Sequence, residues 1–557
     1  MTDGPAARTL DPDGLTHAGL LGGAFRGRPV TVLGFARSGI AAARFLADAG
    51  ARVTVYDGRP AAELRAAIAA LEGRHVTLRL GPDVDPATTW RHAALVVTSP
   101  SINPDYPTTE PRLRAQLAVL VAARAAGDPA APALLSEPDL FLRLCPAPTV
   151  GVTGTKGKTT TSALTAALLA ADPSHPAILG GNIGIPLVER LPELTPGHRV
   201  VVELSELQLP TLSRGTTVAV YTNVTADHLD RHGSLEAYRR VKRRLAELVD
   251  PDGALVLNAE DPVVAAYAGL GTAPALLYRV DRPIPGGVGV VDGWIVGAGV
   301  QRLPLVGGGP AAVGPGGRIL PVDELGIPGR HNVANALAAV GAALLFGVAP
   351  DAIRRAAAAF TGVEHRLETV AVADGVRYVN DSQGTQPDAV IAALRSFEPP
   401  VVLIAGGRDK GVDLSGLAEV VAERAAAAVL IGESADAMAG LFRGAGLARI
   451  ERAATLDDAV ATATALARAA LATRGEAGTG PTGPTATVLL SPAAASFDMF
   501  VDYAARGRAF KTAVARLAAR DATGGAAGDP VDGPSGDGSE VRAGGGAGDR
   551  PGPGANR

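Results

Sequence analysis

Short apolar runs alternate with segments of helical spacing along most of the 557-residue chain. Residues 28–60 are typical of a strand, a glycine turn, a helix and a second strand. The run Val30–Leu33 is short and β-branched, as a strand buried on both faces should be. Ser38 is expected to cap the helix and Gly50 to end it. With Asp57 closing the second strand, the pattern predicts half of a nucleotide-binding βαβ unit.

Two further units of this kind follow. The second begins near Thr149, with a strand before a glycine loop and a helix over 159–171, and strand-like runs recur at 199–204, 217–224 and 253–258. Residues 270–320 are rich in Gly, Val and Pro and predict short strands and turns. The third unit starts near residue 363, with strands expected at 375–381, 400–407, 427–434 and 486–492.

Three such units in a row predict three α/β domains with parallel sheets, each of Rossmann or P-loop type. A Gly/Thr/Pro linker or loop is expected at 473–485, and the last residues are too rich in Gly, Asp and Pro to bury apolar surface. The expected boundaries are 1–27 for an N-terminal extension, 28–145, 146–362 and 363–520 for the domains, and 521–557 for a disordered tail.

Composition narrows the class of protein. Hydrophobic residues make up 47%, charged residues 19%, and the formal net charge is −4, which gives no indication of nucleic acid or a membrane surface as a partner. The single cysteine, Cys145, excludes an internal disulfide and a cysteine zinc cage. No basic, apolar leader and no long apolar run is visible, so we expect a soluble cytoplasmic protein.

The segment GVTGTKGKTTT, Gly151 to Thr161, carries the clearest chemistry. A strict Walker A motif fails because the first glycine comes one residue early. Its chemical parts are nevertheless present: glycines whose N–H groups can face an anion, a lysine for the phosphate oxygens (Lys158) and a hydroxyl for Mg²⁺ (Thr159). An ordinary glycine turn is the alternative, but the position between a strand and a helix favours a nucleotide.

Candidate metal and second-substrate residues follow the later strands. Glu203 ends a strand, where α/β proteins place their ligands, and its carboxylate suits Mg²⁺; a solvated loop glutamate is the alternative. Residues 223–232 gather polar groups that either form a solvated turn or serve function: Asn223, Asp227, His228, Asp230, Arg231 and His232. Ser234 is expected to cap the next helix, on which Lys242 lies beside the apolar face and should be partly buried. Burial favours the neutral form of a lysine.

Several motifs together resemble the Mur ligase family. They are TGTKGKTTT, GGNIGIP (180–186), ELSELQL, NVTADHLDRHGS, GRHNVANALAA (329–339), HRLE (365–368), NDSQGT (380–385), GGRDKGVD (406–413) and SPAAASFDMFVDYAARGRAF (491–510), and the resemblance covers about residues 28–515. It implies an ATP-dependent amide ligase of peptidoglycan precursor synthesis that adds D-glutamate to UDP-N-acetylmuramoyl-L-alanine. ATP phosphorylates the substrate carboxylate, and the amine of glutamate attacks the acyl phosphate.

The resemblance also implies roles for individual residues. The implied ATP-binding set is Gly154, Thr155, Lys156, Gly157, Lys158, Thr159, Thr160, Asn332, Asn335, Arg366 and Asp381. The implied UDP-substrate set is Arg37, Ser38, Asp57, Arg59, Asn182, Ser205 and Gln208, and the glutamate set is Thr385, Lys410, Ser496 and Tyr503. Lys158, Lys242 and His228 are the implied catalytic residues. Two Mg²⁺ ions would be held by Thr159, Glu203, His228 and a carbamylated Lys242, and the partners would be small molecules bound by a monomer.

The chain departs from the family pattern at a few positions. Gln383 stands where lysine is usual, which removes a positive charge near the incoming α-carboxylate. The others are Gln386 for asparagine, Tyr503 for phenylalanine, Ser101 for glycine and Glu206 for serine. A ligase adding L-glutamate, or another amino acid, to the same nucleotide is therefore the alternative, although the retained Lys410, Thr385 and Ser496 favour D-glutamate.

Three more distant alternatives fit less well. A folate polyglutamylating enzyme would lack the domain at 28–145. A non-catalytic scaffold is disfavoured by the intact Lys158, Glu203, His228 and Lys242. An unrelated P-loop ATPase would leave the motifs at 380–385 and 491–510 unexplained.

Overall fold

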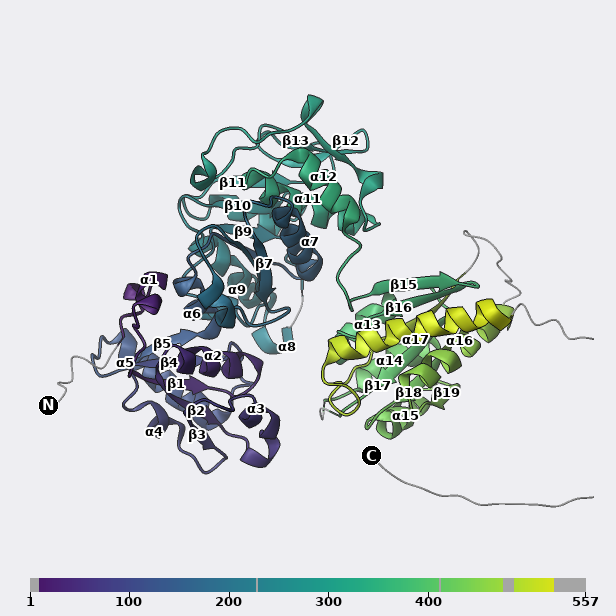
Figure 1. Ribbon diagram of the computed structural model, residues 1–557, viewed down its shortest axis with the longest axis horizontal. Coiled ribbons are helices and arrows are strands. Elements are labelled where there is room, and N and C mark those ends of the chain that lie inside the picture. The colour runs from purple at the N-terminus through teal and green to yellow at the C-terminus, as the bar shows by residue number, and fades with distance from the viewer. Residues whose placement is uncertain (1–9, 227–228, 410–411, 474–484, 525–557) are drawn as a thin grey trace, which may run out of the picture. The chain divides into compact units, whose positions relative to one another are not determined.

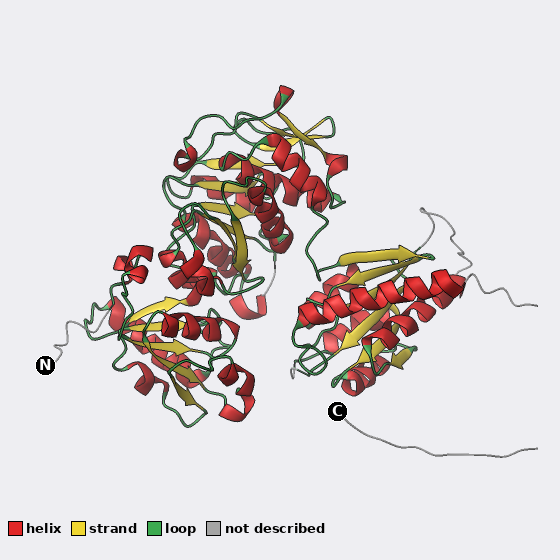
Figure 2. Cartoon of the chain, viewed as in Figure 1, coloured by secondary structure: helices red, strands yellow, loops and turns green. Residues whose placement is uncertain are grey.

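The computed structural model describes residues 10–226, 229–409, 412–473 and 485–524 (Figure 1). Contacts divide the chain into two compact units, Met1–Val363 and Glu364–Arg557. Over the described ranges the strands form three sheets, two in the first unit and one in the second. Figure 2 shows helices packed along each sheet, so the predicted α/β class with parallel sheets is confirmed.

The first sheet has the strand order β3-β2-β1-β4-β5, and its described neighbours all run parallel. The central strand is buried almost throughout, as a parallel strand covered on both faces should be. The strands are β1 (Pro29–Leu33), β2 (Arg52–Asp57), β3 (Val76–Leu80), β4 (Leu95–Thr98) and β5 (Ala133–Ser136). The accompanying helices are α1 (His17–Leu21), α2 (Arg37–Asp48), α3 (Arg65–Ala69), α4 (Pro86–Trp90), α5 (Pro111–Ala125) and α6 (Glu137–Leu144).

Helix α2 begins earlier than its expected cap. Its N-cap is Ala36, and Ser38 is the second residue of the helix, so the prediction that Ser38 caps α2 is wrong. The chain turns sharply at Gly34, with φ of 91°, and this early turn lets the helix start before Ser38. At the other end, Gly50 has φ of 84° just after the helix, and the prediction that it ends α2 is confirmed.

The second sheet has the order β14-β13-β12-β11-β10-β9-β6-β8-β7. From β7 to β11 the neighbours run parallel, whereas β12, β13 and β14 form an antiparallel edge. The strands are β6 (Thr149–Thr153), β7 (Ala177–Gly181), β8 (Arg199–Glu203), β9 (Val218–Tyr221), β10 (Ala254–Asn258), β11 (Ala275–Tyr278), β12 (Val288–Val291), β13 (Trp294–Gly297) and β14 (Arg318–Pro321). The predicted strands and the short strands expected over 270–320 are confirmed.

The order of the second sheet places a switch point at β6. The chain passes from β6 to β7 and β8 on one side and then to β9 on the other, so their carboxyl ends flank one crevice. The helices are α7 (Lys158–Ala170), α8 (Leu229–His232), α9 (Leu235–Leu248), α10 (Pro262–Ala265), α11 (Arg330–Leu345) and α12 (Pro350–Ala359), with short 3₁₀ helices η4 (Leu187–Glu193) and η5 (Leu209–Thr211). The predicted cap of α9 is confirmed, since the Ser234 hydroxyl accepts from the Ala237 N–H.

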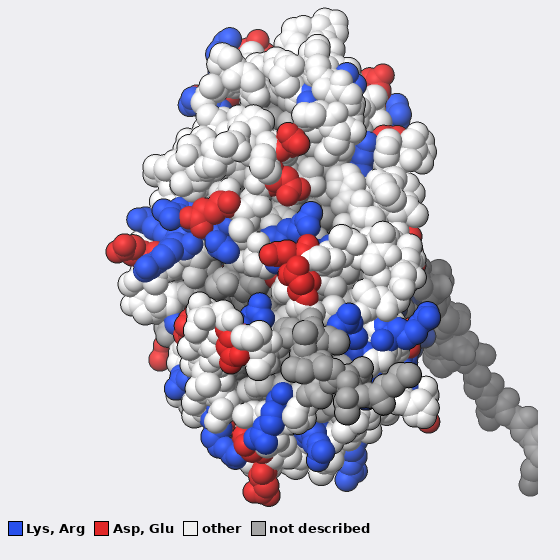
Figure 3. Space-filling model, turned by 90° about the vertical axis from the view of Figure 1, so that its left-hand side faces the viewer, with Lys and Arg blue, Asp and Glu red and all other residues white. Residues whose placement is uncertain are grey.

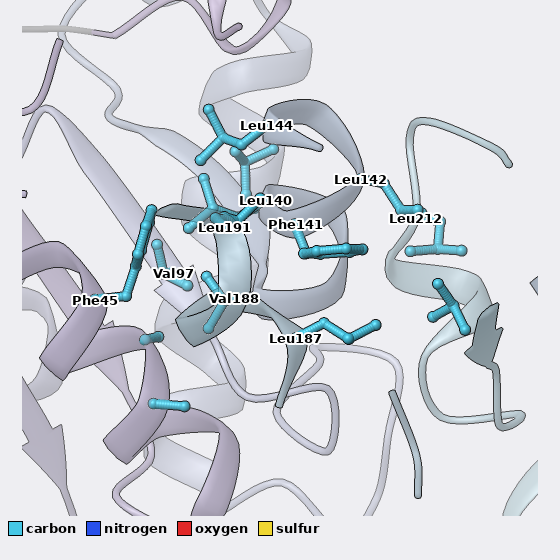
Figure 4. Close-up of a cluster of buried hydrophobic side chains, with 14 of the residues drawn as sticks. Phe45, Val97, Leu140, Phe141, Leu142, Leu144, Leu187, Val188, Leu191 and Leu212 are labelled. Carbon is cyan, nitrogen blue, oxygen red and sulfur yellow. The ribbon is translucent and has the colours of Figure 1, made fainter. Parts of the chain in front are cut away.

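One apolar core joins the first two sheets (Figure 4). Phe45 of α2, Val97 of β4 and Phe141 of α6 belong to one buried cluster with Val188 and Leu191 of η4. Buried apolar area of this kind stabilises the contact by about 25 cal/mol per Å². The first sheet is thereby held against the second within one unit.

The second unit contains the third sheet, with the order β15-β16-β20-β17-β18-β19. β15 pairs antiparallel with β16, and the other described neighbours run parallel. Its strands are β15 (Glu368–Ala373), β16 (Val376–Asn380), β17 (Val401–Gly406), β18 (Ala425–Ile431), β19 (Ile450–Arg452) and β20 (Ala486–Leu490). Its helices are α13 (Pro387–Arg395), α14 (Ser415–Arg424), α15 (Ala435–Gly444), α16 (Leu456–Thr473) and α17 (Tyr503–Gly524).

Two predicted segments lie largely outside the described residues. They are the linker at 473–485 and the tail at 521–557. Helix α17 continues to Gly524, past the boundary expected at residue 521.

The surface seen in Figure 3 carries basic and acidic side chains interspersed over a mostly uncharged face. Among the described helices, none is both long and apolar enough to cross a membrane.

Candidate functional site

The loop between β6 and α7 is shaped for an anion. Gly157 caps α7 in a left-handed conformation, with φ of 85°, and a Cβ there would lie 2.5 Å from Asn335 Oδ1. Gly154 has φ of 145°, and a Cβ there would collide with the Thr222 hydroxyl. Both glycines are therefore required by close approach, and the loop leads into the positive end of a helix.

The segment after β9 supports this loop through hydrogen bonds. Asn223 accepts the Thr155 N–H through its carbonyl at 2.7 Å and the Lys156 N–H through its side chain at 2.9 Å. Thr222 donates its hydroxyl to the Lys156 carbonyl at 2.6 Å. From the sequence, Asn223 was recognisable only as one of a polar cluster, and Thr222 was not predicted to take part. Both residues directly follow β9, which pairs with β6, and this position at the carboxyl end of a strand could have indicated that they contact the loop.

Lys158 places its ammonium group inside the loop. Its Nζ donates to the carbonyls of Gly154 and Thr155, at 3.1 and 3.0 Å. Thr159 is buried at the start of α7, and Thr160 is half-buried beside it. A cation, a hydroxyl and the N-terminus of a helix therefore come together at one point.

The two asparagines of α11 lie against the same helix end. Asn335 Oδ1 accepts from the Thr161 hydroxyl at 3.2 Å, and its Nδ2 donates to Asn332 Oδ1 at 3.2 Å. Asn332 in turn donates to the Pro328 carbonyl at 2.7 Å. The structure thus brings Asn332 and Asn335 to the phosphate-type loop.

Glu203 presents a carboxylate oxygen that suits a cation. It ends β8 in register with Val152 of β6, and only 1% of it is exposed. Oε1 accepts from Asn182 Nδ2 at 2.9 Å, whereas the buried Oε2 has no hydrogen-bond partner among the described residues. An unsatisfied buried carboxylate oxygen is costly unless a proton or metal compensates it, so the site fits Mg²⁺.

The remaining predicted metal ligands are only partly described. No group of three or more His, Cys, Asp and Glu side chains gathers within the described ranges. His228 lies outside those ranges.

Lys242 lies beneath the loop and is fully buried, more than the expected partial burial. Its Nζ donates to the Gly154 carbonyl at 3.0 Å and to Thr153 Oγ1 at 3.4 Å. It also lies 5.5 Å from the ring centre of Tyr238, whose hydroxyl is 3.0 Å from Thr155 Oγ1. Helix α9 therefore contacts the loop through two side chains, Lys242 and Tyr238, and the second of these was not singled out from the sequence.

Asp57 and Arg59 form a pair at the carboxyl end of β2. Asp57 accepts the Phe35 N–H at 2.8 Å and both Nε and NH2 of Arg59, at 3.0 and 2.9 Å. Burial raises the pKa of Asp57, but the hydrogen bonds from Arg59 and Phe35 outweigh it and hold that pKa below its ordinary value. The carboxylate therefore orients the half-exposed Arg59.

The other candidates for the UDP substrate lie where the first two sheets meet. Arg37 of α2 donates to carbonyls of the turn after β7, which includes Asn182. Gln208 is buried and its Oε1 accepts from the N–H and hydroxyl of Ser205, at 2.9 and 3.1 Å. The side chain oxygen of Gln208 thus shapes the turn that follows β8, and Ser38 is half-buried in the first turn of α2.

In the second unit, Asp381 is buried at the end of β16. Its Oδ2 accepts from the Ser491 hydroxyl at 2.6 Å and its Oδ1 from the Leu367 N–H at 3.2 Å. Burial raises the pKa of Asp381 to about 6, although these bonds and the charge of Arg366 oppose the shift. Arg366 is exposed on the turn beside it.

Two of the four predicted glutamate residues, Thr385 and Tyr503, lie at the loop after Asp381. Gln383 donates its N–H to the His365 carbonyl at 3.0 Å, and its Nε2 lies 3.5 Å from the Tyr503 hydroxyl. The Thr385 N–H donates to the Gln383 carbonyl at 2.8 Å. Ser496 is buried and lies a few residues before α17 in the sequence. Lys410 lies outside the described residues.

Arg506 organises this region and was missed by sequence analysis. It is 1% exposed, and donates to the Ser382 carbonyl at 3.0 Å and the Ala494 carbonyl at 3.3 Å. Burial lowers its pKa to about 10. It lay within the quoted motif 491–510, but nothing local distinguished it from a surface arginine.

Two domains of one protein family match the chain. Residues 152–281 match the Mur ligase middle domain, and residues 365–472 match the Mur ligase glutamate ligase domain.

Curated relatives match over nearly their whole length. The UDP-N-acetylmuramoylalanine–D-glutamate ligase of Roseiflexus sp. (strain RS-1) is 38% identical over 499 residues, covering 86% of this chain and 97% of that protein. The ligase of the same name from Anaeromyxobacter dehalogenans (strain 2CP-C) is 39% identical over 495 residues, covering 87% and 97%. Among solved structures, the UDP-N-acetylmuramate-alanine ligase of Thermotoga maritima aligns with a TM-score of 0.45 and 19% identity, over 88% of this chain and 100% of that one.

Proposed function

This chain belongs to the Mur ligase family, and we propose that it joins D-glutamate to UDP-N-acetylmuramoyl-L-alanine with the consumption of ATP. The observation that carries the proposal is the likeness to ligases of that name along 97% of their length. The phosphate-type loop and the buried Glu203 oxygen support the ATP-dependent part of it.

The loop residues bind and orient the nucleotide. The α7 N-terminus and the Lys158 ammonium neutralise phosphate charge, while Asn223 holds the Thr155 and Lys156 N–H groups and so fixes the loop. The γ-phosphoryl group passes to the substrate carboxylate and makes it an electrophile. Asn332 and Asn335 support the start of α7, where the nucleotide phosphates would bind. Arg366 and Asp381 keep the ATP-binding role that the family resemblance implies.

Thr159, Glu203 and His228 would hold Mg²⁺, which supplies charge neutralisation between the phosphates and the carboxylate. Glu203 contributes its free Oε2, while Asn182 fixes its other oxygen. We assign Lys242, as a carbamate, to a second cation position beneath the loop. Its burial supports this assignment because a neutral lysine is the form that reacts with CO2.

The substrates are assigned to the regions that the sequence analysis set out. Residues 28–145 would bind the uridine nucleotide through Arg59 and its neighbours, 146–362 would bind ATP, and 363–520 would bind glutamate through Thr385, Lys410, Ser496 and Tyr503. We also propose that the protein acts in the cytoplasm as a monomer on small-molecule substrates.

The test is phosphate release from the purified full-length chain with Mg²⁺, ATP and UDP-N-acetylmuramoyl-L-alanine, with D-glutamate or L-glutamate in parallel. Release that requires D-glutamate is the expected result. The L-enantiomer is the informative alternative because Gln383 replaces a cation in the family pattern. Release with L-glutamate alone would overturn the stereochemical assignment, and release with neither would overturn the substrate assignment.

A further inference from the structure

We propose that Arg37 is a positioning residue for the cation site, acting on Glu203 through the Gly181–Gly184 turn. The inference rests on the proposed function, because it takes Glu203 as a ligand of Mg²⁺. It assigns Arg37 a task other than binding the UDP substrate, which is the role that family resemblance implied.

Arg37 lies on α2, beside the first sheet, and its side chain contacts the turn that follows β7 of the second sheet. It is the first residue of α2, and its guanidinium donates to the carbonyls of Gly184 at 3.0 Å, Asn182 at 3.2 Å and Gly181 at 3.4 Å. Arginine is suited to this because its donors form a rigid fork. One side chain therefore satisfies three carbonyls of a single turn.

Two glycines, Gly181 and Gly184, allow the backbone conformation of this turn, and contacts from outside the turn stabilise it. Gly181 has φ of 98° and Gly184 has φ of 65°. A Cβ on Gly181 would lie 3.0 Å from a Val202 methyl group and 2.5 Å from the Glu203 carbonyl. Glycine makes this close approach possible but also leaves the turn with little side-chain packing of its own. The hydrogen bonds from Arg37 supply that restraint.

Asn182 connects the turn to the carboxylate. Its N–H donates to the Glu203 carbonyl at 2.9 Å, and its Nδ2 donates to Glu203 Oε1 at 2.9 Å. Glu203 is thus held at both ends by one residue, and its remaining oxygen is left free and buried. Moving the turn would move the donor that fixes the carboxylate, so Arg37 acts as an outer partner of the cation ligand.

A neighbouring arginine provides a matched control. Arg44 lies two turns farther along α2 and pairs with Glu189 of η4 at 3.1 Å. It therefore crosses between the same two parts of the molecule without touching the Gly181–Gly184 turn. A general loosening of this contact would follow from either substitution, whereas loss of positioning would follow only from the change at Arg37.

The test measures Mn²⁺ binding in the presence of ADP and in the absence of the UDP substrate, by electron paramagnetic resonance of free Mn²⁺. Removing an outer partner of a metal ligand typically weakens metal affinity about 10- to 100-fold. We expect Arg37→Ala to weaken Mn²⁺ binding by about tenfold or more, Arg37→Lys to weaken it less, and Arg44→Ala to change it by less than about twofold. Arg37→Ala added to Asn182→Ala should cause little further loss, because both act along one path.

Other outcomes would overturn the inference. Unchanged Mn²⁺ binding in Arg37→Ala, with weaker affinity for UDP-N-acetylmuramoyl-L-alanine, would make Arg37 a substrate ligand. Equal losses in Arg37→Ala and Arg44→Ala would make its role purely structural, and full additivity with Asn182→Ala would exclude the path. A wild-type chain that binds no Mn²⁺ with ADP would remove the cation site on which the inference rests. Failure of the proposed function appears separately, as wild-type protein that binds Mn²⁺ and ADP yet releases no phosphate with either glutamate.

Discussion

The buried Nζ of Lys242 donates to the Gly154 carbonyl at 3.0 Å, which ties helix α9 to the phosphate-type loop. The same helix is pinned to the sheet, because the Tyr221 hydroxyl donates to the Lys242 carbonyl at 2.7 Å. A cationic or carbamylated group at this position therefore has a fixed place relative to the loop. Substitution of Lys242 can distinguish the chemical role of this side chain from its role in packing.

Replacing Lys242 by alanine should lower kcat by roughly 10²- to 10³-fold, the usual effect of removing one preorganised charged group from a transition state. If the lysine works as a carbamate, added acetate should restore part of the activity by entering the space with its carboxylate. Phosphate release at saturating substrates measures both effects.

Arg243→Ala is the matched control, because Arg243 is exposed on the same helix and pairs with Glu247 at 2.7 Å. It should leave kcat nearly unchanged with or without acetate. Absence of acetate rescue in Lys242→Ala would count against the carbamate while leaving the ligase assignment intact.

Gly157→Ala should weaken ADP binding, whereas Gly271→Ala should not. Both glycines have similar φ, 85° and 91°, so alanine strains the backbone at each, by about 1–2 kcal/mol. At Gly157 the new Cβ would also lie 2.5 Å from Asn335 Oδ1, while nothing lies within 4 Å at Gly271. Calorimetric titration with ADP, beside thermal unfolding of each variant, separates nucleotide binding from stability. Equal ADP affinities would mean that the loop tolerates the contact.

The sequence analysis anticipated most of the central strands because buried parallel strands are continuous apolar runs. It missed β3, whose residues alternate between half-buried and exposed and include Arg79, as is typical of a strand at a sheet edge. It also missed β4 and β5, which are only four residues long although they are mostly buried. It also missed β7, which ends in Gly180 and Gly181, residues that usually indicate a turn. Edge position and glycine content both weaken the local signal.

In the candidate site too, features set by contiguous residues could be predicted, whereas contacts between distant segments could not. The loop with Lys158 was recognisable from contiguous residues, and the cap at Ser234 from its neighbours. The support for that loop from Thr222 and Asn223 depends on β9 pairing beside β6, which no short segment specifies. Arg37 likewise meets a turn far along the chain, and only the packing of two sheets brings the two together.

Asp381 should make the second unit less stable as pH rises through about 4 to 6. Burial raises its folded-state pKa to about 6, above the ordinary value near 3.9 in the unfolded chain. The stabilisation from its tighter proton binding is full below about pH 4 and is lost as pH passes about 6, a difference of about 3 kcal/mol. The protection factors of amides in β16 and β20, which correct for the rise of intrinsic exchange with pH, should therefore fall over this range.

Asp381→Asn removes the titrating group and should flatten that pH dependence in the same amides. Amides of β1 in the first unit serve as the internal control, because Asp381 does not lie in that unit. An identical slope in wild type and Asp381→Asn would show that another group titrates.

Gln383→Lys should lower the KM for glutamate by about tenfold or more, because a cation that hydrogen-bonds a carboxylate contributes about 1.5–3 kcal/mol. The Gln383 side chain lies 3.5 Å from the hydroxyl of Tyr503, a residue assigned to the glutamate pocket, so a lysine there would face the same region. Gln386→Lys is the control. It adds the same positive charge at an exposed position, one residue before α13. Phosphate release as a function of D- and L-glutamate concentration measures both variants. A KM that falls equally in both would reflect long-range attraction alone, and a KM unchanged in Gln383→Lys would place position 383 away from the amino acid.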